Sequence, residues 1–130
     1  MSDISNSLVI SASGMRAHSA RLRLTSENLA NVDTPGYRRK VASFEEAAGF
    51  SSVPGEVTIG RTKLDQAELP EIHDPSHPLA NADGYYQGSN VELMIEIADA
   101  REAQRSYEAN LKMFEQTRKM STSLMDLLRR

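Results

Sequence analysis

His73 and His77 are the residues of this 130-residue chain whose spacing most resembles a metal-binding or catalytic pattern. Two histidines four residues apart on a helix would share one face and could hold a metal ion. Pro75 and Pro78 disfavour a regular helix here, and the pattern suggests no clear third ligand. We therefore expect a loop whose polar groups stabilise turns. A metal-assisted enzyme that uses His73, Asp74 and His77 remains as a further hypothesis, beside the two that are given at the end of this subsection.

Other chemistries that a sequence can reveal have no counterpart in this chain. No segment resembles a nucleophile elbow, an oxyanion loop, a phosphate-binding glycine loop or a dinucleotide fingerprint. The absence of cysteine excludes disulfides, zinc knuckles and thiol catalysis, and a net charge of −3 without a long basic run argues against binding DNA or RNA. We predict a protein that is not an enzyme and that binds no cofactor, metal, nucleic acid or small-molecule substrate.

The apolar runs of the chain are short. Leu8-Val9-Ile10 is typical of them, so we expect no transmembrane segment. The N-terminus carries Asp3 and no early Lys or Arg, unlike a cleaved secretory signal. We expect a soluble chain that is complete from Met1, and its length favours a single domain.

Glycine and proline divide the chain into three parts. All five prolines, and six of the seven glycines, fall between Pro35 and Gly88, so the two flanks are free to form long helices. The predicted units are residues 1–33, a turn-rich insert over 34–89, and residues 90–130. The fold is therefore expected to be mainly α, with two long terminal helices that pair as a coiled-coil-like hairpin and a small loop-rich, β-containing insert between them.

The first flank has the spacing of a helical seam. Leu8, Met15, Leu22 and Leu29 recur every seven residues, and a companion row is mostly small or polar. That row consists of Ile4, Ser11, His18, Thr25 and Val32. Such a seam is weak as an isolated two-stranded coiled coil, so we expect this helix to pack against more than one neighbour.

The second flank is longer, and Asn90 is its expected N-cap. Two rows of mainly apolar residues run along it, which predicts a face broad enough to contact at least two other helices. A helix from about Val91 to Arg130 would be roughly 60 Å long, whereas a compact globule of this size is only about 35 to 40 Å across. The remaining apolar surface must therefore meet other chains.

These rows define the expected subunit interface. On the first flank and the turn after it, the interface residues are Leu8, Met15, Leu22, Leu29 and Val32, and on the second flank they are Leu93, Ile97, Tyr107, Leu111, Phe114, Met113, Met120, Leu124 and Leu127.

Between the flanks, short strands are expected at Val57-Thr58-Ile59 and around Leu69 and Ile72, and a short helical turn from Ser43 to Ala48. Val53-Pro54-Gly55-Glu56 has the residues of a type II turn.

The stretch from Glu27 to Tyr37 predicts the end of the first helix. Asn31 can adopt the left-handed conformation that ends helices, and Thr34-Pro35-Gly36-Tyr37 matches a type II turn. The basic triplet Arg38-Arg39-Lys40 follows. It is interpreted either as a solvated stretch or as a partner for acidic residues of an adjacent subunit.

Leu29-Ala30-Asn31-Val32-Asp33-Thr34-Pro35-Gly36-Tyr37 resembles the N-terminal signature of bacterial flagellar rod, hook and hook-associated proteins. Two further stretches, from Asp74 to Tyr85 and from Arg101 to Asn110, look like the basal-body rod proteins of that group, and the similarity covers nearly the whole chain. The residues assigned to the family's turn motif are Asn28, Ala30, Asn31, Asp33, Thr34, Pro35, Gly36 and Tyr37.

The resemblance implies a structural subunit of the proximal basal-body rod, which polymerises through its terminal helices into the shaft that transmits torque from motor to hook. It implies export, unfolded, from the cytoplasm by the flagellar type III apparatus and a final location in the basal body within the periplasm. The implied partners are further copies of the chain, the other proximal and distal rod proteins, and an adaptor at the export gate. The alternative is a soluble helical adaptor or chaperone of the same secretion system.

Overall fold

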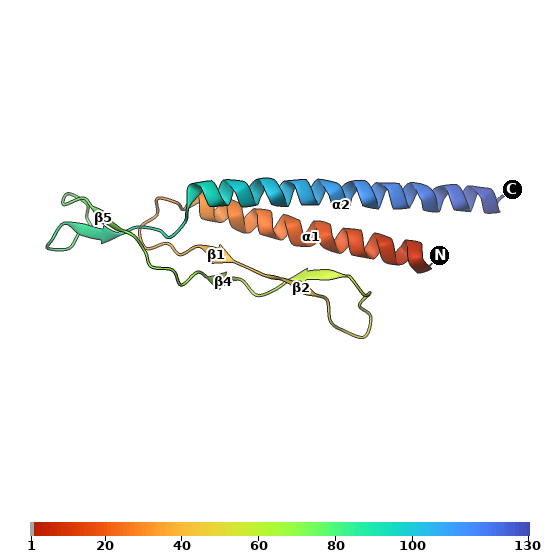
Figure 1. Cartoon of the computed structure of the whole chain (residues 1–130), viewed down its shortest axis with the longest axis horizontal. Helices are drawn as coiled ribbons and strands as arrows, with labels where there is room; N and C mark the ends of the chain where they lie inside the picture. The colour runs from red at the N-terminus through yellow and green to blue at the C-terminus, as the bar shows by residue number, and fades with distance from the viewer. Residues whose placement is uncertain (1) are drawn as a thin grey trace.

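The computed structural model describes residues 2–130, so the expected start at Met1 lies outside the described residues. Helix α1 (Ser2–Ala30) and helix α2 (Leu93–Leu128) lie side by side and antiparallel, with both chain ends at the same end of the pair (Figure 1). The strands between them are β1 (Lys40–Val41), β2 (Phe44–Glu46), β3 (Val57–Ile59), β4 (Lys63–Leu64), β5 (Glu71–His73) and β6 (Tyr85–Gln87). The prediction of a mainly helical chain whose terminal helices pack together, with a small β-containing insert, is confirmed.

Helix α1 ends at Ala30 without a left-handed residue. Among the described residues only glycines have a positive φ, so the prediction that Asn31 adopts the left-handed conformation is wrong. The Asn31 side chain instead donates from Nδ2 to the carbonyl oxygen of Glu27 (2.8 Å), which satisfies one of the carbonyls that a helix end leaves free. The next turn follows the prediction: Tyr37 N donates to Thr34 O at 3.2 Å, and Gly36 has a φ of 73°, as a type II turn requires.

Helix α2 begins at Leu93, and the preceding residue, Glu92, makes no side-chain capping hydrogen bond. The prediction that Asn90 caps this helix is therefore wrong. Its Oδ1 accepts a hydrogen bond from Arg39 N (2.6 Å), and its Nδ2 donates to Asp65 O (3.0 Å). The amide is occupied by the loops of the insert, so it cannot serve the free N–H groups of the helix.

The insert consists of three separate antiparallel ladders, which join β1 to β4, β2 to β3, and β5 to β6. The strands predicted at Val57–Ile59 and around Ile72 are confirmed as β3 and β5, whereas no strand forms at Leu69. The helical turn predicted over residues 43–48 is wrong, because residues 44–46 pair with β3 as strand β2. The pairing partner is distant in sequence, so local propensity could not reveal it.

The β2–β3 ladder lies along α1, while the β5–β6 ladder projects beyond the far end of the helix pair (Figure 1). Ser13 Oγ on α1 accepts a hydrogen bond from Val57 N (3.1 Å), and the rings of His18 and Phe44 meet edge to face with centroids 4.9 Å apart. These contacts attach the hairpin to the middle of α1.

Small and polar side chains fill the contact between the two helices. A Cβ atom added to Gly14 would lie 2.8 Å from Oδ1 of Asn110, so glycine permits the close approach at this level. The buried residues of α2 are Glu96, Ala103 and Thr117. Across the described residues the buried hydrophobic side chains are Ala17, Leu24, Val91 and Ala103, which make a very small core.

The two helices differ in length. α2 has 36 residues, which gives roughly 54 Å, and α1 has 29. Because Gly14 lies opposite Asn110 in an antiparallel pair, the last turns of α2 project beyond the start of α1 (Figure 1). Within residues 2–130, neither helix has a stretch both long and apolar enough to cross a lipid bilayer.

Candidate functional site

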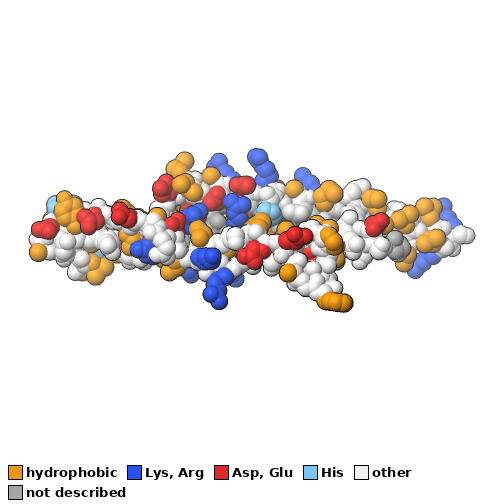
Figure 2. Space-filling view, turned by 60° about the horizontal axis from the view of Figure 1, so that its bottom comes forward, with side chains coloured by type: hydrophobic (Ala, Val, Ile, Leu, Met, Phe, Trp, Pro, Cys, Tyr) orange, Lys and Arg blue, Asp and Glu red, His pale blue; other side chains and the backbone are white. Residues whose placement is uncertain are grey.

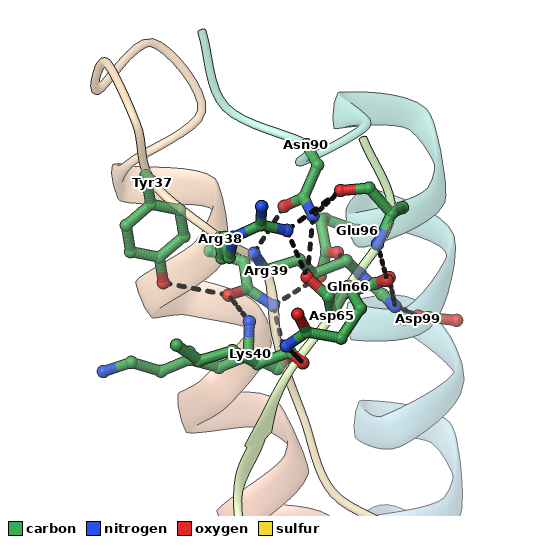
Figure 3. A network of polar contacts seen from close by, with 12 residues as sticks. Tyr37, Arg38, Arg39, Lys40, Asp65, Gln66, Asn90, Glu96 and Asp99 are labelled. Atoms are coloured by element: carbon green, nitrogen blue, oxygen red, sulfur yellow. Dashed lines mark hydrogen bonds and ion pairs between the residues drawn. The ribbon is translucent and has the colours of Figure 1, made fainter. Parts of the chain in front are cut away.

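The turn after α1 is held by a group of side chains that we call the elbow network: Asn28, Tyr37, Arg39, Asn90 and Glu96. The labelled members converge where the first turns of α2 meet the chain leaving α1 (Figure 3). They come from α1, from the segment that follows it, from the segment that enters α2, and from the first turn of α2 itself. The network therefore sets the angle at which the insert leaves the helix pair.

Asn28 is 1 % exposed and uses its whole amide. Its Oδ1 accepts hydrogen bonds from Tyr37 Oη (3.0 Å) and Lys40 N (2.8 Å). Its Nδ2 donates to Lys40 O (2.9 Å) and to Glu96 Oε2 (3.4 Å). The Asn28 side chain thus bonds both the N–H and the carbonyl of residue 40, as a neighbouring strand would, and links this backbone to α2.

Glu96 is a fully buried carboxylate, also 1 % exposed, on the face of α2 that meets α1. Arg39 Nε donates to its Oε1, and the same guanidinium contacts Asp99 Oδ2 at 3.0 Å. Burial alone would lower the pKa of Arg39, but the hydrogen bond and negative charge of Glu96, together with Asp99 and Asp65, raise it. The buried negative charge is therefore neutralised within the chain.

Arg38 and Lys40, the neighbours of Arg39, make further contacts within the chain. Arg38 donates to the carbonyl oxygens of Asp65 and Ala67, both at 3.1 Å, and Lys40 Nζ lies 3.1 Å from Glu27 Oε2. All three members of the basic triplet thus have partners inside their own chain. The hypothesis that the triplet pairs with acids of an adjacent subunit is not needed to explain it.

Burial also acts on Tyr37. It raises the pKa of the phenol, Lys40 opposes the shift, and the charges of Glu27 and Glu96 add to it. A raised pKa favours the protonated hydroxyl, which is the form that donates to Asn28 Oδ1.

The remaining residues of the turn motif hold the two ends of the insert together. Gly36 N donates to the carbonyl oxygens of Gln87 (3.1 Å) and Gly88 (3.2 Å), and Ser89 Oγ donates to the carbonyl oxygen of Val32. Thr34 Oγ1 donates to Asn31 Oδ1 at 3.1 Å. The other members are Ala30 and Asp33, which are exposed, and Pro35, which is half-buried.

The expected interface residues on α1 and the turn after it lie beside the intramolecular contact. Leu8, Met15, Leu22 and Val32 are half-buried and Leu29 is exposed, whereas the residues buried on α1 are mainly small or polar. The large row that we expected to form the seam therefore retains surface that another chain could cover.

The same holds for α2. Of the expected interface residues, Ile97 and Phe114 are half-buried, and the exposed ones are Leu93, Tyr107, Leu111, Met113, Met120, Leu124 and Leu127. Met15 and Tyr107 line one groove between the helices, and Met120, Leu124 and Leu127 line another on α2. At about 100° per residue these side chains flank the small, polar contact line on both sides. Figure 2 shows hydrophobic side chains gathered near the end where α2 projects.

The histidine segment is built as a set of turns. Asp74 Oδ1 accepts from Ser76 Oγ (2.7 Å) and Ser76 N (3.2 Å), and these bonds lower the pKa of Asp74. The ring of His73 packs against Tyr85, and that of His77 stacks on Tyr86. Among residues 2–130, no group of His, Asp and Glu side chains is arranged to hold a metal ion.

Two protein families match the sequence of this chain. Residues 8–38 match the family described as flagella basal body rod protein, and residues 82–127 match the C-terminal family of the flagellar basal body rod FlgEFG proteins. The flagellar basal-body rod protein FlgC of Agrobacterium fabrum is 39 % identical, over 99 % of this chain and 98 % of its own. The chain belongs to the flagellar basal-body rod protein family.

Two further rod proteins are similar to this chain over nearly its whole length. The FlgC proteins of Bacillus subtilis and Salmonella typhimurium are each 31 % identical; the first match spans 94 % of this chain and 96 % of its own, the second 91 % and 92 %. The N-terminal family match contains the whole turn motif, and the C-terminal match contains most of α2. All three relatives are named as flagellar basal-body rod proteins.

Sequence reasoning missed Glu96, Asn90 and Asp99 as parts of the elbow. Glu96 and Asp99 stand three residues apart, so they share one face at the start of α2, and this acidic pair was the available signal. Nothing in the spacing could assign Arg39 to it, because 57 residues separate Arg39 from Glu96.

Proposed function

We propose that the chain is a structural subunit of the flagellar basal-body rod and polymerises side by side with other subunits through its terminal helices. The observation that carries the proposal is the large apolar surface left uncovered along both flanks of a long helix pair. A monomer with so small a core gains burial only by association, and binding of a neighbour stabilises the folded form. The names of the relatives do not favour the alternative of a soluble adaptor or chaperone.

The coiled-coil-like seam predicted from the heptad spacing belongs, in this proposal, between chains. Within one chain the contact line is small and polar, so the helices approach closely at Gly14. The larger side chains of the row Leu8, Met15, Leu22 and Leu29 then face the helices of neighbours. The proposed units remain the helical ends of the rod core, residues 1–33 and 90–130, and the insert, residues 34–89.

The proposal includes a path and a location. The chain leaves the cytoplasm unfolded through the flagellar type III apparatus and joins the basal body in the periplasm. A weak α1 with Gly14 in its interior agrees with passage in an unfolded form, because glycine costs about 1 kcal/mol relative to alanine inside a helix. Its neighbours there are further copies, other proximal and distal rod proteins, and an adaptor at the export gate. The assembled helices carry torque toward the hook.

The test replaces an exposed apolar residue of α2 in a bacterium that lacks its own copy of the chain. Leu111→Asp, or Leu22→Asp on α1, is expected to abolish incorporation into basal bodies and motility, because a charge cannot be buried unpaired against a neighbour. Export of the variant should persist, because the chain passes through the apparatus unfolded. Lys112→Asp, one residue further on, is the matched control. Full motility of both leucine variants would contradict the seam assignment.

A further inference from the structure

The loop between β2 and β3 ends in a fully exposed aromatic side chain. Phe50 is 113 % exposed, and the tip, residues 47–55, contains no charged residue. Its conformation is set locally: Gly55 has a φ of 91°, and Glu56 N donates to Val53 O (2.9 Å), as the predicted type II turn requires. In Figure 2 hydrophobic atoms project from the molecule at this hairpin. Within residues 2–130, no contact covers the ring of Phe50.

A groove of about 510 Å³ lies along α1 where Tyr107 of α2 borders it. Its lining residues are Ala12, Met15, Arg16, Ser19, Ala20, Arg23 and Tyr107. Its floor is therefore made of small side chains, methionine and tyrosine, which is the surface that an aromatic side chain can fill. Within residues 2–130, neither Arg16 nor Arg23 takes part in an ion pair of 4.0 Å or less.

The charges around the two features are opposite. Glu45, Glu46 and Glu56 flank the uncharged tip, and the first two make no ion pair in the described residues. Two free guanidinium groups flank the groove. A contact that places the ring in the groove would therefore bring carboxylates toward arginines, which favours the correct register.

The tip and the groove lie at similar heights on different faces of α1. A Cβ atom added to Gly55 would lie 3.6 Å from Ile10 Cδ1, and Val57 N donates a hydrogen bond to Ser13 Oγ. The hairpin therefore covers the face of α1 that carries Ile10 and Ser13. At about 100° per residue, Ala12 and Ser19 point well away from that face. A chain therefore cannot fill its own groove with its own tip, but a copy beside it can.

We propose that the tip of one copy inserts Phe50 into the α1 groove of a second copy. The contact joins two different surfaces, so it is heterologous and repeats from one subunit to the next into a ring or a helical array. The inference rests on the proposed function and deepens it, because it names a lateral contact between neighbouring subunits of the shaft. The occupant is a second copy of this chain.

Cysteine cross-linking tests the contact, since the chain has no cysteine of its own. Phe50→Cys and Ser19→Cys are produced as single variants in the same cells, and isolated basal bodies are mildly oxidised. The expected product is a disulfide-linked dimer that needs both variants. The matched control pairs Phe50→Cys with Ser5→Cys, an exposed serine of α1 outside the groove, and should give none.

A charge exchange supplies the second readout. Arg23→Glu or Glu46→Arg, each added to the cross-linking pair, should reduce the dimer, and the two together should restore it. Ser51→Ala at the tip is the neutral control. Loss of the dimer without restoration in the double variant would contradict the charge pairing.

The outcomes separate the inference from the proposed function. Unmodified chain present in basal bodies, with no more dimer from position 19 than from position 5, overturns the inference and leaves the rod function intact. A cross-link from position 50 to a protein of another mass also overturns it. Absence of the unmodified chain from basal bodies overturns the proposed function itself.

Discussion

The two ends of the helix pair are built on opposite principles. At the elbow end, buried polar groups such as Asn28 and Glu96 find all their partners within the chain. At the other end, the last turns of α2 carry Leu124, Leu127 and Leu128, which are 42 %, 65 % and 79 % exposed. One end has completed its contacts and the other has not.

This difference separates what one chain does for itself from what it leaves to neighbours. A buried charge must be paired at once, because leaving it unpaired costs several kcal/mol. An apolar side chain exposed to water costs less free energy than an unpaired buried charge, so it can remain uncovered until another subunit binds. The elbow therefore fixes the shape of each subunit, and the flanks with the projecting end of α2 provide surface for association.

The largest expected loss of stability follows from removing the cation of the elbow network. Arg39→Ala leaves Glu96 buried without its charge partner, and the free energy of unfolding should fall by about 3 to 5 kcal/mol. Urea unfolding followed by helical circular dichroism measures it. Lys40→Ala, which removes only the half-exposed pair with Glu27, should cost about 1 kcal/mol or less. Equal losses in the two variants would mean that burial at the elbow is unimportant.

A smaller effect grades the same network. Asn28→Ala removes all the hydrogen bonds of the amide and leaves neighbouring groups unsatisfied, so it should cost about 1 to 3 kcal/mol. Tyr37→Phe removes only the bond to Asn28 Oδ1 and should cost about 1 kcal/mol. The same unfolding assay ranks them, and a larger loss for Tyr37→Phe would place the centre of the network elsewhere.

The projecting end should give the opposite result. Leu127→Asp is expected to change the free energy of unfolding of the monomer by less than about 0.5 kcal/mol, because the side chain is exposed. Incorporation into basal bodies, measured by immunoblotting of the isolated structures, should nevertheless be lost. Normal incorporation would show that this end stays uncovered in the assembly. Lys112→Asp, exposed on the same helix and outside the groove that Leu127 lines, is the control.

The smallest effect concerns pH where the insert meets α1. Burial and the charge of Arg21 lower the pKa of His18, against the opposing charge of Glu102, and its buried Nδ1 has no hydrogen-bond partner among the described residues. The unfolded chain, with an ordinary histidine pKa of about 6.5, then binds the proton more readily than the folded chain. The free energy of unfolding should decrease as pH falls through about 6.5 and level off below the folded pKa.

His18→Phe, which preserves a ring against Phe44, should flatten this dependence in unfolding curves recorded at several pH values. His77→Phe, which preserves the stack on Tyr86, should leave it unchanged. An unaltered slope in the His18 variant would assign the pH dependence to other groups.

Much of the fold followed from residue types and spacing. The absence of proline and glycine from residues 91–130 predicted α2, and Pro35 with Gly36 predicted the turn after α1. Strand β2 was missed because its pairing with β3 is a tertiary contact. Asn31 and Asn90 were given capping roles from local preference, and both amides were taken by other partners.

The sequence by itself determined that two long helices flank a turn-rich insert and that they carry more apolar surface than one small chain can bury, because helical period and helix breakers act locally. Only the tertiary structure decided which row of side chains on α1 contacts which row on α2. It placed the small residues Gly14 and Ala103 in the helix contact and the larger leucines beside it. It also brought Arg39 to Glu96 across 57 residues, since burial of a carboxylate on α2 requires a cation and the elbow supplies one.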